Sequence, residues 1–455
     1  MKQFLSIFAI LLAPLLSASA APPNIVLIMA DDLGWWDTHF QGNEDLETPN
    51  LDQFAREGML FPQGYAAASV CTPTRAAMMT GMSPARLGIT NHAPGHKDGM
   101  VPEGQKFAGA KKLTFLPLDA TTIAERLRDE AHYKTGFVGK WHLSHRKGND
   151  EEGNAREPLL RPEFQGYDLN IGGCDRGGPP SYFDPYRIPA LESRKKGEYL
   201  PTRMADECIA FLRENKKGPF FLTLWNYSVH YPIEAPEDLI KKYTDRKVKN
   251  PAYAAMIEGM DRSIGRVLKE LDTLGLEENT LVIFTSDNGS LFTNGPLRAN
   301  KGHLYEGGIR VPWVIRWPGK IEAGSRSEAT IISTDVFPTL LEVAKLKPVP
   351  GTPLDGESLV PLFTGTGELK RESLFFHYPN YAFHKRNRLA GAIRKGEFKL
   401  IRNYDDNSLE LYNLKDDLGE KKNLAESDPA RAQALRKELN QWLKESGAQM
   451  PSRVE

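Results

Sequence analysis

Four short apolar runs constrain the fold of this chain most strongly. They span residues 24–30, 135–139, 219–225 and 280–286. Continuous apolar runs of this length are typical of strands that are buried on both faces of a sheet. Helical patterns precede three of these runs, over residues 122–130, 202–215 and 251–274. This alternation predicts an α/β fold with a large, mostly parallel sheet that is flanked by helices.

Each apolar run leads into polar side chains that can do chemistry. These are Asp31-Asp32 after the first run, Lys140-Trp141-His142 after the second, Asn226 to His230 after the third, and Asp287-Asn288-Gly289 after the fourth. Ligands of parallel sheets bind outside the carboxyl ends of the strands. We therefore expect the four polar groups to meet in one site.

The stretch 71–81 adds a cysteine to this picture. Thr72 is predicted to be the N-cap of a helix and Pro73 its first residue, which places Cys71 just before the helix N-terminus. Such an end attracts anions, and Arg75 offers a fork of donors to a tetrahedral oxyanion. The local stretch leaves two readings open, a nucleophile at an anion site or a half-buried structural thiol.

Composition and the N-terminus bound the function classes. The 455 residues include 58 Lys and Arg against 59 Asp and Glu, a net charge of −1 that gives no support to nucleic-acid binding. Residues 1–20 read as a signal peptide that is cleaved after Ala20, with an uncleaved anchor as the alternative. No later run is long enough to span a membrane, so we expect an exported protein, periplasmic or secreted. A Cys174–Cys208 disulfide remains open.

The C-terminal part has a different sequence pattern, with short strand candidates separated by turns. A turn at 305–312 is expected to enter another strand, and residues 334–340 to begin a further helix. Short strand candidates follow at 374–378, 390–394, 398–402 and 409–413, with a closing helix at 429–445. We therefore predict a catalytic domain over 21–367 and a smaller α+β subdomain with an antiparallel sheet over 368–455.

Together these motifs resemble those of type I sulfatases in the alkaline-phosphatase-like superfamily, which include arylsulfatase A-like and polysaccharide sulfatases of bacteria. The likeness extends from about residue 24 to about residue 340. Its motifs occur in the family's order: Asp31-Asp32, Cys71-Thr72-Pro73-Thr74-Arg75 with Thr80-Gly81, Gly139-Lys140-Trp141-His142, His230, Asp287-Asn288-Gly289, and Lys301-Gly302 with Glu306-Gly307-Gly308.

The resemblance implies a manufactured nucleophile. In this family a formylglycine-generating enzyme, or an anaerobic equivalent, reads Cys-x-Pro-x-Arg and oxidises the cysteine, here Cys71. Thr74 stands where serine or alanine is usual. The hydrated aldehyde attacks sulfur through one oxygen and forms a covalent sulfate ester, and its second oxygen lets the intermediate collapse.

The resemblance also assigns the other residues. Asp31, Asp32, Asp287 and Asn288, with the Cys71-derived oxygen, would bind one Ca²⁺, and Mg²⁺ is acceptable. Arg75 and Lys140 would bind the sulfate, His142 would be the base, and His230 and Lys301 would serve the leaving oxygen. Each residue type taken alone also fits a turn, a salt bridge or a structural histidine.

The substrate follows only in outline. We expect a sulfated small molecule or oligosaccharide, with a phosphate or phosphonate monoester hydrolase as one alternative. A non-catalytic protein that binds sulfated glycans is another, if Cys71 is not matured. Loop residues that are candidates for a cationic rim are His92, His96, Lys97, Lys111, Arg176, His384, Lys385, Arg386 and Arg388. Candidates for stacking on sugars are Tyr182, Tyr186, Tyr378 and Tyr381, although core packing is expected for at least half of them.

Overall fold

The centre of the molecule is an eight-stranded sheet with the strand order β10-β2-β9-β8-β1-β7-β5-β6. The computed structural model describes residues 21–145, 157–292, 294–348, 350–382 and 387–454. The strands of the sheet are β1 (Asn24–Ala30), β2 (Met59–Leu60), β5 (Lys134–Gly139), β6 (Leu169–Ile171), β7 (Phe220–Trp225), β8 (Thr280–Ser286), β9 (Val314–Arg316) and β10 (Ser325–Arg326). Neighbours from β8 to β6 pair in parallel, and β9 is antiparallel to β8 and β2. The predicted mixed, mostly parallel α/β sheet is confirmed.

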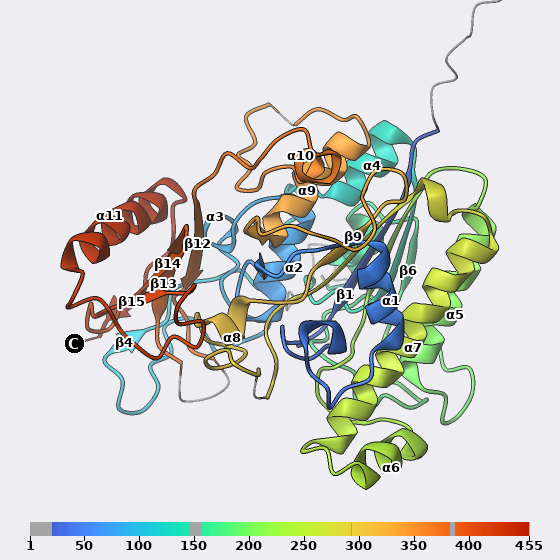
Figure 1. The fold of residues 1–455 in the computed structure, drawn as a ribbon, viewed down its shortest axis with the longest axis horizontal. Coiled ribbons are helices and arrows are strands. Elements are labelled where there is room, and N and C mark those ends of the chain that lie inside the picture. The colour runs from blue at the N-terminus through green and yellow to red at the C-terminus, as the bar shows by residue number, and fades with distance from the viewer. Residues whose placement is uncertain (1–20, 146–156, 293, 349, 383–386, 455) are drawn as a thin grey trace, which may run out of the picture.

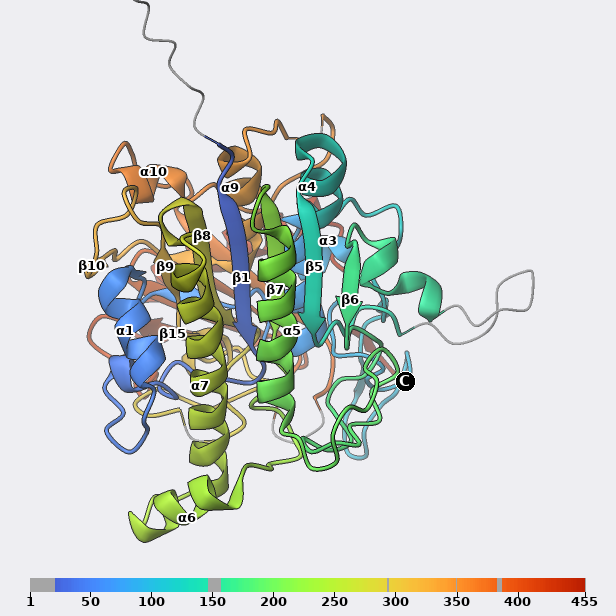
Figure 2. The same ribbon diagram turned by 90° about the vertical axis from the view of Figure 1, so that its right-hand side faces the viewer.

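Helices cover both faces of this sheet (Figures 1 and 2). One face carries α1 (Pro49–Glu57), α5 (Leu200–Asn215) and α7 (Pro251–Thr273), with α6 (Glu237–Asp245) packed on α7. The other face carries α2 (Cys71–Thr80), α4 (Ile123–Ala131) and α9 (Val336–Val343). Strand β1 serves both cores, because Ile25 and Leu27 face one side while Val26 and Ile28 face the other.

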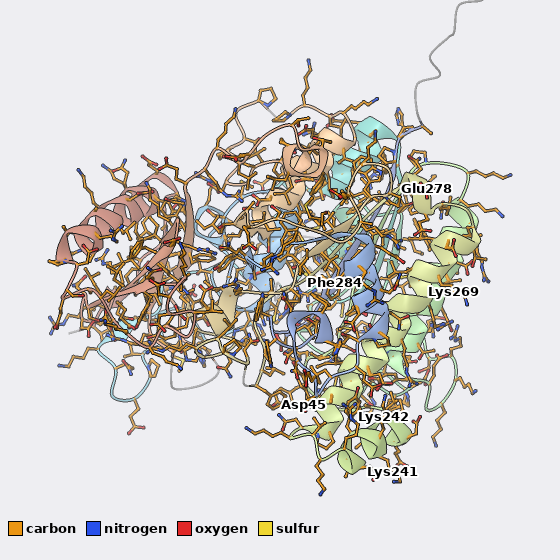
Figure 3. The ribbon with its side chains drawn as sticks, viewed as in Figure 1. Asp45, Lys241, Lys242, Lys269, Glu278 and Phe284 are labelled. Atoms are coloured by element: carbon orange, nitrogen blue, oxygen red, sulfur yellow. The ribbon has the colours of Figure 1, made fainter. Side chains whose placement is uncertain are left out.

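Apolar side chains fill the interior, and many lysines lie at the surface. Phe284 of β8 lies inside the body, whereas Lys241 of α6 and Lys269 of α7 lie at the exposed surface (Figure 3). No helix of the described residues is long and apolar enough to cross a membrane. The predicted signal peptide, residues 1–20, lies outside the described residues.

The predicted strands and helices occur where the sequence places them, with small shifts. The four apolar runs are β1, β5, β7 and β8, and the three helical patterns are α4, α5 and α7. The helix expected at 334–340 is α9, preceded by a 3₁₀ turn at Ser333–Asp335. The turn expected at 305–312 instead contains a short helix, α8 (Glu306–Ile309), because the Arg310 N–H closes a helical turn on the Glu306 carbonyl.

The start of α2 corrects one prediction. The helix begins at Cys71 itself, with extended Val70 at the N-cap position, so Thr72 is a helical residue rather than the cap. The Thr72 hydroxyl instead accepts the Ala93 N–H at 2.9 Å. Pro73 therefore occupies the third helical position, where its missing N–H still costs no intrahelical hydrogen bond.

A four-stranded antiparallel sheet and one helix form the C-terminal end, on one side of the body (Figure 1). They are β12 (Ser373–Tyr378), β13 (Ala390–Lys395), β14 (Phe398–Asn403), β15 (Leu409–Asn413) and α11 (Pro429–Glu445). One face of the sheet packs on α11. The other face shares an apolar cluster with Tyr65, Val70 and Ala77 of the main body.

Short elements complete the described chain. They are β3 (Gly64–Tyr65) paired with β11 (Ile331–Ile332), β4 (Phe107–Ala108) paired with β16 (Ser452–Arg453), the helices α3 (Pro84–Leu87) and α10 (Val360–Thr364), and the 3₁₀ turns His39–Gln41, Pro158–Leu160, Pro162–Phe164 and Glu277–Asn279. All three cysteines are buried free thiols, so the structure contains no Cys174–Cys208 disulfide.

Candidate active site

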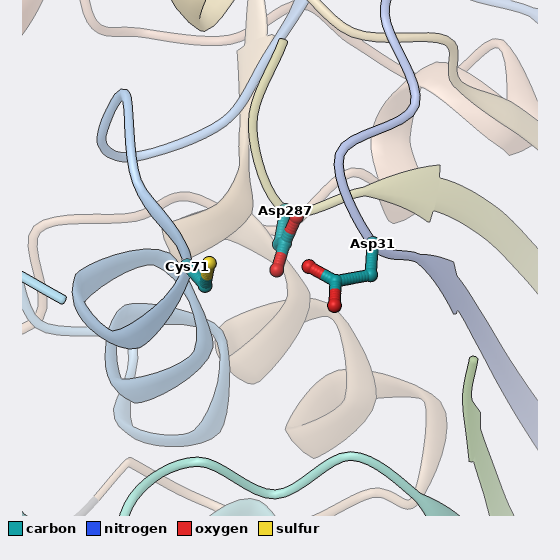
Figure 4. A group of neighbouring side chains, drawn as sticks. All are labelled: Asp31, Cys71 and Asp287. Carbon is teal, nitrogen blue, oxygen red and sulfur yellow. The ribbon is translucent and has the colours of Figure 1, made fainter. Parts of the chain in front are cut away.

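Cys71 lies at the start of α2, opposite the ends of β1 and β8 (Figure 4). Its side chain is buried, and its Sγ receives the Lys301 ammonium at 3.3 Å. Burial raises the pKa of the Cys71 thiol to about 11. The thiol is therefore protonated at neutral pH, which is the wrong state for a thiolate nucleophile.

Carboxylates from two adjacent strands face the cysteine. Ala30 and Ser286, the last residues of β1 and β8, stand side by side in parallel register, so Asp31 and Asp287 emerge together. Ligand atoms of Asp31, Cys71 and Asp287 all lie within 4.8 Å of one another (Figure 4). The Asn288 side-chain amide donates to Asp32 Oδ1 at 2.7 Å. All four oxygen-bearing residues that the sequence nominated for a metal are thus in one buried cluster.

The cluster fits a hard divalent cation. Asp31 Oδ1, Asp32 Oδ2 and Asn288 Oδ1 are buried and have no hydrogen-bond partner among the described residues. Burial also raises the pKa of Asp31, and its neighbours Asp287 and Asp32 add to that effect. A divalent cation would satisfy these oxygens and favour the charged form of the carboxylates.

Three cations balance the three carboxylates. Arg75 donates to Asp287 Oδ2 at 2.9 and 2.7 Å, Lys140 to Asp31 Oδ2 at 2.6 Å, and Lys301 pairs with Asp32 Oδ1 at 2.6 Å. Burial acts to raise the pKa of Asp287, but the Arg75 charge holds it below its usual value. The formal charges cancel, so a bound divalent cation would leave the site positive and attractive to an anion.

Two histidines lie close to the charged groups of this cluster. His142, which follows β5, donates from Nε2 to the Ala93 carbonyl at 2.6 Å. Only an N–H can bond to a carbonyl, so Nδ1 carries the lone pair, and it has no hydrogen-bond partner among the described residues. His230 likewise donates from Nδ1 to the Tyr231 carbonyl at 2.9 Å, which leaves Nε2 3.7 Å from Asp32 Oδ2.

Both histidines are neutral in this arrangement. Burial lowers the pKa of His142 well below its ordinary value, and the Lys140 charge adds to the effect. Burial also lowers the pKa of His230, to about 3. A neutral His142 with a free Nδ1 is suited to accept a proton.

Close backbone packing holds the segment Asp287-Asn288-Gly289 in place. The Gly289 N–H donates to the Gly308 carbonyl at 3.0 Å, and a Cβ at Gly289 would stand 1.9 Å from the Gly307 carbonyl oxygen. No side chain fits at that distance, which explains the glycine directly after Asp287-Asn288. The two glycines in α8 have the same reason, since a Cβ at Gly307 or Gly308 would stand 2.2 Å or 2.0 Å from a backbone carbonyl oxygen. The six predicted catalytic residues and the five predicted metal ligands, which share Cys71, lie together in one site.

The predicted rim is brought together only in part. His92 and His96 are half-buried, Lys97, Lys111 and Arg176 are exposed, and His384, Lys385 and Arg386 lie outside the described residues. Arg388 is ion-paired with Asp405 and Asp406, so its charge is compensated. We therefore no longer count Arg388 as a rim cation.

The four tyrosines proposed for sugar stacking are all in the core. Tyr182, Tyr186 and Tyr378 are at most 1% exposed and Tyr381 is 9% exposed. The prediction of stacking was wrong for these residues, since none offers a free ring face. The structure instead exposes Tyr231, beside His230, which the sequence analysis missed. Its position next to a site histidine was the only available signal.

Comparisons with known proteins agree with this geometry. Residues 23–346 match the model of the sulfatase family, and residues 299–449 match that of the N-sulphoglucosamine sulphohydrolase C-terminal region. Human arylsulfatase A is 35% identical over 421 residues, covering 84% of this chain and 75% of the relative. A sulfatase of Formosa agariphila is 30% identical and covers 98% and 95%.

A solved structure shares the whole fold. Ps i-CgsB in complex with k-i-k-neocarrahexaose superposes with a TM-score of 0.78 at 28% identity, covering 93% of each chain. The two family matches together cover residues 23–449, from the first strand to the C-terminal sheet. The chain belongs to the sulfatase family of sulfuric ester hydrolases, with the alkaline-phosphatase-like fold.

Proposed function

We propose that this sulfatase hydrolyses sulfate monoesters of carbohydrates, with formylglycine at position 71 and one bound Ca²⁺. The observation that supports the proposal is the arrangement beside Cys71. Buried oxygens of Asp31, Asp32 and Asn288 have no hydrogen-bond partner among the described residues, and three cations are paired with the carboxylates. A sulfatase that depended on the thiol itself would need a lower pKa at Cys71 than burial allows.

Asp31, Asp32, Asp287 and Asn288 would hold the calcium ion, together with an oxygen at position 71. Calcium accepts six to eight oxygen ligands in flexible geometry, which suits a cluster of carboxylates and one amide. When bound, the ion would neutralise charge on a sulfate oxygen and on the nucleophile. Magnesium is acceptable for the same donor set.

The protein's own side chains would orient the ester and move its protons. The Arg75 guanidinium and the Lys140 ammonium would bind the sulfate oxygens, since both already lie among the site carboxylates. His142 would accept a proton at Nδ1. The Lys301 ammonium would stabilise and protonate the leaving oxygen, and His230 would face that oxygen through Nε2.

Maturation of Cys71 would have to precede folding. Cys71 is 1% exposed, and Pro73 and Arg75 are buried in α2. A formylglycine-generating enzyme, or its anaerobic equivalent, could not reach this motif in the folded protein. We therefore propose that such an enzyme acts on the unfolded or nascent chain.

The carbohydrate part of the proposal has two supports. A structural relative at 28% identity was solved with a bound oligosaccharide. Export would give the protein access to external glycans, and we propose cleavage after Ala20, which N-terminal sequencing of the mature protein would show.

The test combines mass spectrometry with one substitution. We expect the tryptic peptide containing residue 71 to carry the aldehyde mass in active protein. Cys71→Ser should lower kcat for a sulfate ester on the order of a thousandfold or more, with an unchanged melting temperature, because a nucleophile is lost without a change of packing. A fully unmodified thiol in active protein would contradict the formylglycine assignment. Matched phosphate and phosphonate esters, assayed in parallel, test the alternative enzyme class.

A further inference from the structure

Tyr231 is an exposed aromatic residue next to His230, which we place on the leaving-oxygen side of the site. Its side chain is 51% exposed, whereas most large apolar side chains of the protein are buried. Its carbonyl accepts the hydrogen bond that fixes the His230 ring. Tyr231 is therefore an exposed aromatic residue that directly adjoins His230 and helps to hold its ring.

Two further aromatic rings pack in a row behind Tyr231, toward the core. Its ring meets Phe292 edge-on, with centroids 6.3 Å apart, and Phe292 meets Tyr253 with centroids 4.7 Å apart. Tyr253 is 5% exposed, and its hydroxyl donates to Asp37 at 2.7 Å. The row therefore runs from the rigid core to the surface, which preorganises the exposed ring.

A cavity adjoins this row. It has a volume of about 490 Å³, and Phe292, Asn300 and His303 are among the residues that line it. Lys301 lies between the last two in sequence and contacts Cys71, and its backbone N–H donates to the Ser290 carbonyl at 2.9 Å. The segments 290–292 and 300–303 are thus side by side, and two residues that line the cavity flank Lys301 in the sequence.

The lining has the mixed character that sugars require. Phe292 and Leu291 offer apolar surface, while Lys249, Asn250, Asn300 and His303 offer polar groups. A pyranose ring presents C–H groups on its face and hydroxyls at its edge, so it can stack on an aromatic ring while it hydrogen-bonds to such neighbours. A wholly apolar alcohol would leave the polar groups unused.

We infer that Tyr231, supported by Phe292, is the specificity-determining surface on which the pyranose ring of the leaving alcohol stacks, and that the adjoining cavity holds the next sugar of an oligosaccharide. This inference rests on the proposed function, because it takes His230 as the group on the leaving-oxygen side. It replaces the buried tyrosines as the site of sugar stacking.

The experiment compares Tyr231→Ala and Tyr231→Phe with the matured wild-type enzyme. The substrate is the defined sulfated oligosaccharide that the wild type hydrolyses fastest, and inorganic sulfate is the competitive inhibitor. We expect Tyr231→Ala to raise KM about three- to tenfold, which corresponds to about 0.6–1.4 kcal/mol, with little change in the inhibition constant of sulfate. Tyr231→Phe keeps the ring and should stay near wild type.

Phe164→Ala is the matched control, since Phe164 is 49% exposed and lies in the 3₁₀ turn Pro162–Phe164. It should change neither constant. An unchanged KM in Tyr231→Ala, an equal weakening of sulfate inhibition, or an equal loss in Tyr231→Phe would each overturn the inference. So would a wild type that hydrolyses aryl sulfates and no sulfated sugar. A wild type that hydrolyses no sulfate ester at all would instead refute the proposed function.

Discussion

Single residues in this site adopt states that their neighbours impose. His142 has φ 58° and Asp32 has φ 62°, so both occupy the left-handed region that few non-glycine residues adopt. In His142 this conformation accompanies the hydrogen bond from Nε2 to Ala93, which leaves Nδ1 bare. A backbone carbonyl therefore determines which nitrogen of the His142 ring carries the proton.

His142→Asn tests the role of that nitrogen. Asparagine tolerates the left-handed conformation but lacks the imidazole base. We expect kcat to fall about 10²- to 10⁴-fold, the usual contribution of a general base, with a small change in melting temperature. The control is His39→Gln, because the side chain of His39 is 51% exposed and contacts Asp52. Activity of His142→Asn near wild type would show that another group takes the proton.

The residue types of the site could be predicted from sequence, because they follow buried strands whose ends must meet. The protonation of the histidine rings and the exposure of the tyrosines could not be predicted. The tautomer of His142 depends on a carbonyl 49 residues away, and the burial of Tyr182 depends on packing with segments distant in sequence. Tyr231 was missed because exposure is a property of the fold and not of a motif.

Among the elements, α8 joins the catalytic part to the C-terminal sheet. Lys399 of β14 is fully buried and lies 2.9 Å from both Glu306 of α8 and Glu420. The Glu306 N–H also donates to Glu420 at 2.7 Å. Burial raises the pKa of Glu420 to about 7. At Glu306 burial acts in the same direction, but Lys399 and Arg310 lower its pKa to about 2.

This cluster predicts a pH-dependent effect of Glu420→Gln. Folded Glu420 keeps its proton above the ordinary pKa of 4.5, so its contribution stabilises the fold below that pH and is lost as the pH rises through about 7. Glutamine stays neutral. We therefore expect the stability of the variant relative to wild type to rise between pH 5 and pH 8, on the order of 1–3 kcal/mol.

Thermal or urea unfolding at both pH values measures this change. Glu397→Gln is the control, since the Glu397 side chain is 50% exposed and pairs only with Lys415 among the described residues. A difference between Glu420→Gln and wild type that is equal at both pH values would contradict the raised pKa. Three segments, α8, β14 and the segment around Glu420, together create this burial.

At the scale of the whole molecule, the C-terminal sheet completes the core of the main body. Its inner face shares a cluster with Tyr65, Val70 and Ala77, and Ala77 belongs to the helix that begins at Cys71. We propose that the part over 368–455 is a layer of one folding unit. The sequence predicted its strands well, but the shared face could not be predicted, because it joins segments some 300 residues apart.

Expression of residues 21–367 alone tests this view. We expect no cooperative unfolding transition by circular dichroism, because the truncation uncovers the apolar cluster and leaves Glu306 buried without Lys399. The full mature chain is the control. A soluble fragment with a cooperative transition would show that residue 367 ends an independent domain.

The overall topology was only partly predictable. Continuous apolar runs required strands buried on both faces, and the strand-end residues identified the functional edge. The strand order was not readable, because β2, β9 and β10 are two or three residues long and carry no pattern.

Because the charges of the three carboxylates and three cations cancel, the binding of a divalent cation and the binding of sulfate are coupled. If a divalent cation converts a neutral site into a positive one, each bound cation strengthens the binding of sulfate, and by thermodynamic reciprocity sulfate strengthens the binding of the cation by the same factor. In Cys71→Ser protein, calorimetry should therefore show tighter calcium binding in the presence of inorganic sulfate than of chloride at equal ionic strength, whereas equal affinities would contradict the coupling. The enzyme would then hold its metal most firmly where sulfated material is abundant and release it where there is nothing to hydrolyse.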